Sequence, residues 1–244
     1  MKIFVDTANL QDIEEALRRG FVEGVTTNPS LLAKEPKSNF EKHIGKIVDL
    51  IKEHRDGAHL SVEVFSSEPK EILKQAKKFK KIFNYSALSI KIQVGWDELK
   101  AIHMLSKEGI SVNCTACMSV MQGIMASRAG ARYISFFWGR IRDGASDVKF
   151  LAQRNECLKK QVLNDEDFNP YLVVNRARRM LNQDNLGTEI IAGSIRGVTD
   201  IRDAGLAGAH IVTVPPKFFK DMVSHFKTEE VVQQFLSDFK KWLR

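Results

Sequence analysis

Two kinds of hydrophobic pattern alternate along this 244-residue chain. Short apolar runs rich in Val, Ile and Phe are typical of buried strands. They occur at eight places: 3–6, 24–27, 60–65, 88–94, 111–115, 133–137, 189–193 and 211–214. The segments between them repeat apolar residues at helical spacing. Strands that alternate with helices predict parallel pairing through right-handed crossovers, and eight such units in one chain favour a (β/α)8 TIM barrel, an α/β fold.

Helix start and stop signals agree with this pattern. Asn9, Pro69 and several glycines lie where caps are expected, and they predict helices over 10–19, from 69 to about 79, 96–107 and 198–207. The competing fold is a doubly wound open sheet. That fold needs a Gly-rich phosphate loop after its first strand, and VDTANL is not such a loop. The barrel is therefore the better prediction.

Two segments go beyond the regular barrel. The stretch 143–187 is longer than a crossover needs, and its composition predicts two helices on either side of Asn169-Pro170. The segment 228–244 repeats apolar residues at spacings of three and four and predicts an amphipathic helix with a broad apolar face: Val231, Val232, Phe235, Phe239 and Trp242. We expect one domain over 1–244, with this helix packed on its own barrel or on a neighbouring subunit.

Composition narrows the class of protein. Apolar residues make up 43% and charged residues 27%, which is ordinary for a globular protein. No apolar run approaches the roughly 20 residues of a membrane span, and MKIFVDTANL lacks the pattern of a signal peptide. Three cysteines do not make a disulfide framework. We expect a cytoplasmic protein without a membrane partner.

The net charge of +7 raises the question of a nucleic-acid partner. The basic residues are interleaved with Asp and Glu, however, and the densest group has the spacing of an exposed helix face: Lys77, Lys78, Lys80 and Lys81. Nucleic acid is therefore disfavoured, whereas a small anionic ligand suits the same charge.

In a barrel of this type the active site lies at the carboxyl ends of the strands. Polar residues at or near those ends combine acids, a lysine, hydroxyls and arginines: Asp6, Asn28, Glu63, Lys91, Thr115, Ser135, Arg140, Ser194 and Arg196. Such groups suit carbonyl chemistry on an anionic substrate. The two arginines and Ser194 can bind phosphate, or they can belong to surface salt bridges.

Lys91 is the most informative of these residues. It lies between two isoleucines in a predicted buried strand, where alternation directs it into the barrel. A buried ammonium group needs a carboxylate partner or a lowered pKa. A partly neutral lysine is the nucleophile that forms a Schiff base with a ketone. The alternative is a structural ion pair with Glu63 or Asp6, and these two carboxylates can act as proton shuttles or as counterions only.

Other reactive residue types carry weaker signals. Cys114 and Cys117 have CxxC spacing but no second pair for zinc, and the six histidines form no HxH or HExxH motif. A metal site is therefore not expected. We expect Trp96, Trp138 and Trp242 to be packing residues.

The quoted residues fall in motifs that resemble those of the transaldolase family. The likeness is to the short subfamily that includes fructose-6-phosphate aldolase. The motifs follow family order on all eight predicted strands: FVDTAN, GVTTNPS, SVEV, IKI, VNCTA, YISFFWGRI, AGSIR and AGAHIVTVP. Only about 45 residues after Ile141 lie outside this likeness.

The resemblance implies a (β/α)8 class I aldolase that uses neither metal nor cofactor. Lys91 matches the Schiff-base lysine, and Asp6 matches the acid/base that acts on the carbon–carbon bond. Glu63 and Thr115 match the pair that holds the catalytic water. The positions matching contacts to the dihydroxyacetone unit and its surroundings are Thr27, Asn28, Asn113, Ser135 and Phe137, and those matching the phosphate site are Arg140, Ser194 and Arg196.

The resemblance also implies phosphorylated sugar substrates and a homo-oligomer built on five-fold rings, a pentamer or a decamer. The 228–244 helix is then expected at the subunit interface. In the aldolase branch of the family, Gln stands at the position that matches Glu63 and Tyr at the position that matches Phe137. By this resemblance, Glu63 and Phe137 favour transfer over free aldol cleavage. Gln93 and Trp96 depart from the usual motif after the lysine and point to an altered substrate, such as a modified or longer-chain sugar. A catalytically reduced sugar-phosphate-binding barrel is the non-enzymatic alternative.

Overall fold

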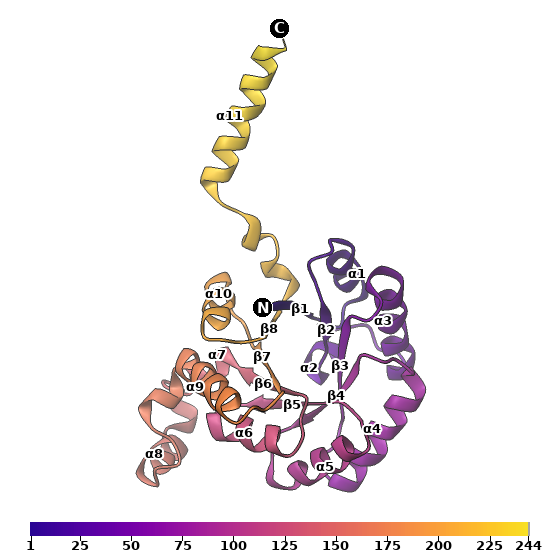
Figure 1. The fold of residues 1–244 in the computed structure, drawn as a ribbon, viewed down its shortest axis with the longest axis vertical. Helices are drawn as coiled ribbons and strands as arrows, with labels where there is room; N and C mark the ends of the chain where they lie inside the picture. Colours follow the sequence, from indigo (N-terminus) through magenta and orange to yellow (C-terminus); the bar gives the residue numbers. More distant parts are fainter. Residues whose placement is uncertain (244) are drawn as a thin grey trace.

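The computed structural model describes residues 1–243, and its centre is a closed barrel of parallel strands (Figure 1). The strands pair in chain order, and the last pairs with the first. They are β1 (Lys2–Asp6), β2 (Gly24–Thr26), β3 (His59–Glu63), β4 (Leu88–Gln93), β5 (Val112–Cys117), β6 (Tyr133–Phe137), β7 (Glu189–Gly193) and β8 (Ile211–Val214). The predicted (β/α)8 fold is confirmed.

One strand differs from its predicted bounds in an informative way. β5 continues two residues beyond the expected end at Thr115, because its pairing with β6 shifts register between Cys114 and Cys117. Ala116, inside this irregularity, has a positive φ of 61°. Such a bulge bends a strand and redirects its side chains. The bend lies directly after Thr115, one of the predicted site residues.

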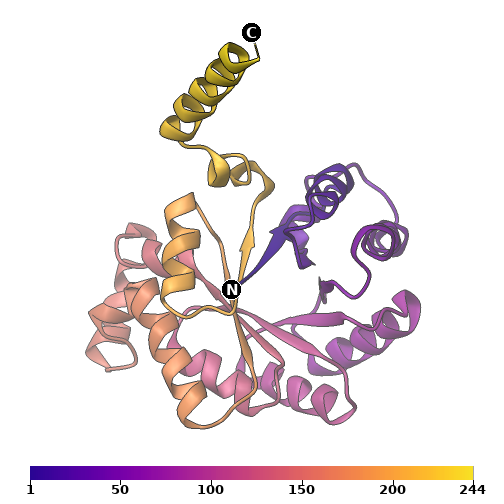
Figure 2. The same cartoon turned by 45° about the horizontal axis from the view of Figure 1, so that its top comes forward.

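Helices surround the barrel (Figure 2). They are α1 (Leu10–Arg18), α2 (Pro29–Leu32), α3 (Phe40–Arg55), α4 (Pro69–Phe83), α5 (Trp96–Lys107), α6 (Val120–Arg128), α7 (Trp138–Asp143), α8 (Leu151–Lys159), α9 (Pro170–Gln183), α10 (Val198–Leu206) and α11 (Phe226–Trp242). α4 extends one turn past its predicted end and stops at Asn84, whose left-handed φ of 39° forms the cap. The core lies between the outer faces of the strands and the helices, where Ile90, Ile92 and Ile102 are completely buried.

The stretch 143–187 contains two helices on either side of Asn169-Pro170, α8 and α9. α9 belongs to the helical ring, and its buried residues include Val173, Val174 and Leu181. α8 has no buried residue and lies outside the ring (Figure 1). The extra length of this segment therefore forms a projection on one flank of the barrel.

α11 stands away from the barrel that it follows (Figures 1 and 2). None of its described residues is buried, and Phe235 and Phe239 are 66% and 56% exposed. Packing on its own barrel, one of the two alternatives from the sequence, is therefore wrong. The expectation for the tryptophans is wrong in part, because Trp138 is buried while Trp96 and Trp242 are about four-fifths exposed. Among residues 1–243 no helix has the length and apolar character to cross a membrane.

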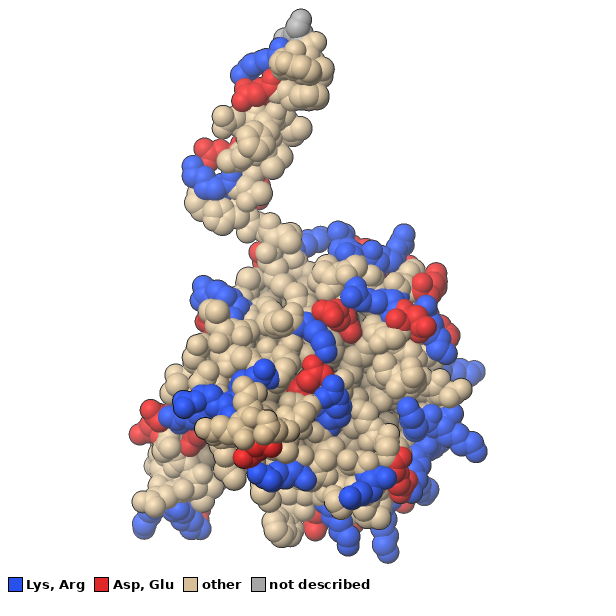
Figure 3. All heavy atoms as spheres, in the orientation of Figure 1, with Lys and Arg blue, Asp and Glu red and all other residues tan. Residues whose placement is uncertain are grey.

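Basic and acidic side chains are intermixed on the surface (Figure 3). On α4, Lys77 lies 2.8 Å from Glu108, and Lys78 lies 2.6 Å from Glu41. The lysine-rich segment is thus an exposed helix face, as predicted.

Candidate active site

Lys91 lies inside the barrel on β4 and is 5% exposed. Its Nζ lies 3.1 Å from Glu63 Oε2 and donates a hydrogen bond of 2.9 Å to the carbonyl oxygen of Thr27. The register of β3 and β4 places Glu63 opposite Lys91, so the barrel itself positions the pair. The buried ammonium group therefore has the carboxylate partner that its burial predicts, Glu63.

Asp6 ends β1 on the same side of the barrel. Its carboxylate accepts a 2.7 Å hydrogen bond from Thr26 Oγ1. Burial raises the pKa of Asp6 above its ordinary value, while the nearby Lys91 charge and the Thr26 hydroxyl oppose that rise. A raised pKa makes this carboxylate a stronger base than an ordinary aspartate, which suits a group that accepts and returns a proton.

A cleft of about 1230 Å³ opens beside Asp6, between the ends of β1 and β8. Lys34 of the α2–α3 connection lines it together with Leu31, Ile195 and Pro215. The Lys34 charge also acts to lower the pKa of Asp6. Sequence reasoning missed Lys34 because its loop has no local motif.

Thr115 is buried on β5, and its Oγ1 has no hydrogen-bond partner among the described residues. A buried hydroxyl is normally hydrogen-bonded to protein or to ordered water. Its partner in the β4–β5 ladder is Gln93, two residues beyond Lys91. Thr115 thus offers an uncommitted hydroxyl at the level of the site.

Asn113 and Ser135 form a connected pair on neighbouring strands. Ser135 Oγ donates 2.7 Å to Asn113 Oδ1, and Asn113 Nδ2 donates 3.0 Å to Ser61 Oγ. Asn113 lies directly opposite Lys91 in the β4–β5 ladder. The structure therefore brings these two predicted substrate contacts together beside the lysine.

Thr27 and Asn28 follow β2 and have structural contacts of their own. Thr27 is fully buried, and its hydroxyl donates 3.1 Å to the carbonyl of Ser61. Asn28 Oδ1 accepts 3.0 Å from Leu31 N, which caps α2. Thr27 is part of the barrel wall, while the amide nitrogen of Asn28 donates to no described protein group.

The predicted phosphate residues lie at the ends of β6 and β7. Arg140 on α7 and Arg196 after β7 are both exposed, and Arg196 forms an ion pair with Asp143. Ser194 has a positive φ of 57° and its carbonyl accepts from Gly139 N at 3.1 Å. The two loops approach so closely that a Cβ on Gly139 would lie 2.6 Å from both Ser194 O and Arg196 Nε.

Asp200, which sequence reasoning missed, supports these loops. Asp200 is 6% exposed. Its carboxylate accepts hydrogen bonds from Arg196 N at 3.0 Å, from Trp138 Nε1 at 3.2 Å and from Arg142 Nη1 at 2.8 Å. Its position in the first turn of α10 was the available signal, because acidic residues there are typical of helix starts. Asp200 ties the β6 and β7 loops together.

Gln93, Trp96 and Phe137 lie at the rim. Gln93 Nε2 donates 3.1 Å to Ser66 O and 3.0 Å to Glu98 Oε1, so its amide joins two rim loops. Trp96 is 83% exposed at the start of α5. Phe137 is half-buried at the junction of β6 and α7.

The cysteines and the other residue types that can bind metals were the remaining candidates from the sequence. Cys114 and Cys117 are free and buried, and hydrogen bonding with Cys114, together with burial, raises the pKa of the Cys117 thiol. No three His, Cys, Asp or Glu side chains of the described chain could together hold a metal ion.

Comparison with known proteins identifies the family. The family model described as Transaldolase/Fructose-6-phosphate aldolase matches residues 3–243. A probable transaldolase from Desulfosudis oleivorans is 38% identical over 241 residues, which cover 99% of both chains. Probable transaldolases from Alkaliphilus metalliredigens and Clostridium kluyveri are 36% and 37% identical and cover 98% of this chain and 98% and 97% of their own.

Solved structures show a likeness of fold. A crystal structure of a mandelate oxidase variant superposes with a TM-score of 0.53 at 14% identity, covering 88% of this chain and 65% of that one. At this identity the likeness concerns the barrel alone.

The environment of Asp6 generates a prediction. Thr26→Val removes the hydrogen bond that favours the charged carboxylate, so the pKa of Asp6 should rise further above its ordinary value. Carboxyl ¹³C NMR titration of both proteins measures this change directly. The control is Thr199→Val, at an exposed position on α10, and it should leave the Asp6 titration unchanged. A pKa that falls or stays constant in Thr26→Val contradicts the assigned contact.

Proposed function

Because the chain belongs to the transaldolase/fructose-6-phosphate aldolase family, we propose that it transfers a dihydroxyacetone unit between sugar phosphates. The donor is a ketose phosphate and the acceptor is an aldose phosphate. The observation that carries this proposal is Lys91, which is buried in the barrel 3.1 Å from Glu63 and whose charge also acts on the carboxyl group of Asp6. A buried amine next to two carboxylates suits Schiff-base chemistry.

Lys91 is the nucleophile in this proposal. Its ammonium group passes a proton to Glu63, directly or through a water, and the neutral amine attacks the ketose carbonyl carbon. The attack leaves an extra proton on nitrogen and a negative charge on oxygen, and one proton moves from that nitrogen to the oxygen. Glu63 and the free hydroxyl of Thr115 hold the water that passes the second proton, from Glu63, to the same oxygen. The oxygen then leaves as water, and the product is a protonated imine that can accept the electron pair of the bond between its α and β carbons.

Asp6 then acts as general base. Its carboxylate removes the proton from the hydroxyl on the carbon beyond the scissile bond, that carbon becomes an aldehyde, and the bonding pair moves into the imine to form an enamine. With the acceptor aldehyde bound, the enamine carbon attacks its carbonyl, and Asp6 returns the proton to the new hydroxyl. Hydrolysis of the imine releases the product ketose and restores Lys91.

The remaining predicted residues are assigned to binding. Asn28, Asn113 and Ser135 supply amide and hydroxyl groups for the dihydroxyacetone unit. Arg140, Ser194 and Arg196 form the phosphate site in this proposal. The Arg196–Asp143 pair is partly exposed, and exposed pairs contribute little, so a phosphate can replace Asp143 at the guanidinium group. Glu63 and the apolar Phe137 favour transfer to an acceptor over free cleavage.

The Schiff base is tested with Lys91→Met. Met has a similar length and no buried charge, so the variant should fold while losing turnover. Fructose 6-phosphate is supplied with and without erythrose 4-phosphate, and borohydride is added to trap the imine. The expected result is acceptor-dependent turnover and a covalent adduct at Lys91 in the wild type, with neither in the variant. A folded wild type without an adduct would indicate the sugar-phosphate-binding alternative, and substantial turnover by Lys91→Met would exclude this lysine as nucleophile.

The phosphate site is tested with Arg196→Ala. Loss of a charge-assisted hydrogen bond should raise KM for the phosphorylated ketose about tenfold to a hundredfold, with little effect on its dephosphorylated analogue. The matched control is Arg202→Ala, which removes an exposed arginine paired with Asp203 on α10. Equal effects of Arg196→Ala on both substrates would place the anion site elsewhere.

We also propose that α11 lies at an interface between copies of this chain. Its apolar residues cover no part of its own barrel, and an apolar face of this size is normally covered. The family resemblance favours five-fold rings, as pentamers or decamers. The same resemblance, the phosphorylated substrates and the three free cysteines favour the cytoplasm as its compartment.

Truncation after Lys227 tests the role of α11. The barrel closes before this point through the β1–β8 pairing, so the shortened chain should fold but assemble into smaller particles. Light scattering of the intact and truncated proteins measures the change. A monomeric intact protein contradicts the oligomer, whereas an unchanged oligomer after truncation removes α11 from the interface.

A further inference from the structure

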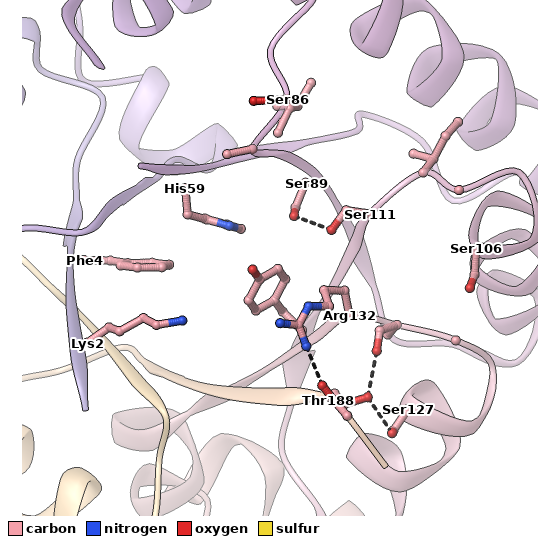
Figure 4. A pocket seen from close by; sticks show the side chains of 18 of the residues that line it. Lys2, Phe4, His59, Ser86, Ser89, Ser106, Ser111, Ser127, Arg132 and Thr188 are labelled. Carbon is pink, nitrogen blue, oxygen red and sulfur yellow. Dashed lines mark hydrogen bonds between the residues drawn. The ribbon is translucent and has the colours of Figure 1, made fainter. Parts of the chain in front are cut away.

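A second cavity, of about 770 Å³ (Figure 4), is lined by the first residues of four strands: Lys2, His59, Leu88 and Tyr133. It therefore lies at the amino-terminal end of the barrel, opposite the Lys91 site. His59, the first residue of β3, projects into it and is 7% exposed. The imidazole stacks on Phe4 at 4.9 Å between ring centroids and meets the edge of Tyr133 at 4.6 Å. These contacts hold the ring in a defined orientation.

A chain of hydrogen bonds connects His59 with the candidate active site. His59 Nε2 lies 2.6 Å from Ser61 Oγ, and Ser61 Oγ accepts 3.0 Å from Asn113 Nδ2. Asn113 Oδ1 in turn accepts 2.7 Å from Ser135 Oγ. His59, Ser61 and Glu63 alternate along β3, so one strand carries both the start of this chain and the carboxylate partner of Lys91.

The Asn113 amide sets the direction of the two hydrogen bonds that it makes. The Asn113 amide donates through nitrogen to Ser61 and accepts through oxygen from Ser135. Ser61, already an acceptor, then has its own proton available for His59 Nε2. With its proton given to Asn113, Ser135 presents only lone pairs to the site. It can therefore accept, but not donate, a hydrogen bond with a substrate hydroxyl.

This direction requires a neutral imidazole with its proton on Nδ1. Burial lowers the pKa of His59 to about 3, with further lowering by the charges of Lys2 and Arg132. Glu189 is the acidic group beside them, 2.9 Å from Lys2 and 3.0 Å from Arg132, and it pairs with both. The lowered pKa of His59 favours the neutral ring, which can accept the Ser61 proton at Nε2 when its own proton is on Nδ1.

We propose that His59 is a positioning residue that acts through Ser61 and Asn113 to hold Ser135 as a hydrogen-bond acceptor for a hydroxyl of the donor sugar. The assignment of a sugar donor rests on the proposed function. The direction of the hydrogen bonds depends only on residues inside the barrel and not on any substrate. The direction and the positioning role are therefore tested in separate experiments.

¹⁵N NMR of the imidazole groups tests the direction without substrate. The resonances of His59 are identified by their loss in His59→Phe. The expected spectrum is that of a neutral ring with the proton on Nδ1 between pH 5 and pH 9. A proton on Nε2, or titration of the ring within this range, would overturn the proposal whether or not the chain is a transaldolase.

A double-mutant cycle of His59→Phe and Ser61→Ala tests the positioning role. Each single variant should lower kcat/KM for the donor ketose about fivefold, the value of one hydrogen bond, and the double variant should lose no more than either single variant. KM for the acceptor should not change. His59→Gln carries an acceptor oxygen near the position of Nε2 and should restore most of the wild-type value.

Ser89→Ala is the matched control. Ser89 is a buried serine of the same cavity, but its hydroxyl is hydrogen-bonded to Ser111 and takes no part in the hydrogen bonds that connect His59 with Ser135. The Ser89→Ala variant should have the same kcat/KM for the donor ketose as the wild type. Thermal unfolding should show that all variants are folded. Additive losses in the cycle, or equal losses in Ser89→Ala and His59→Phe, would overturn the positioning role. Wild-type protein without turnover or adduct would instead refute the proposed function.

Discussion

A buried positive charge dominates the interior of this barrel. Lys91 lies among apolar strands with 5% of its surface exposed, and an ammonium group there is costly unless carboxylate and carbonyl oxygens surround it. Glu63 at 3.1 Å and the carbonyl of Thr27 at 2.9 Å meet this requirement. Glu63 comes from β3, which pairs with β4, and Thr27 follows β2, the next strand beyond β3. The position of the charge therefore depends on the closure of the sheet.

The polar groups around this charge are of two kinds: those that already form hydrogen bonds within the protein and those that do not. Thr27 and Thr26 have their hydroxyls engaged and form the wall and the support of Asp6. Thr115 retains an uncommitted buried hydroxyl next to the bulge in β5. The site thus combines a rigid hydrogen-bonded frame with a few groups left available for substrate or water, which is the arrangement that preorganised catalysis requires.

The two faces of the barrel are linked through its interior. The polar side chains of β3 run from His59 at one end to Glu63 at the other, and Asn113 and Ser135 join them from β5 and β6. The amino-terminal face of a TIM barrel is usually assigned to stability. Here its buried histidine lies at one end of a hydrogen-bonded chain that leads through Ser61 and Asn113 to Ser135.

The sequence by itself determined the element order, the parallel barrel and the inward direction of Lys91, because strand alternation and helical spacing are local properties of the chain. The motifs also identified Asp6, Glu63 and Thr115 as groups at the strand ends. Only the tertiary structure decided which of these residues touch. The Lys91–Glu63 contact, the Asp200 bridge between two loops and the role of His59 all join residues on different elements, through the register of neighbouring strands and the packing of loops. The exposure of α11 was likewise undecided by its sequence, since an amphipathic pattern requires an apolar partner without specifying which surface supplies it.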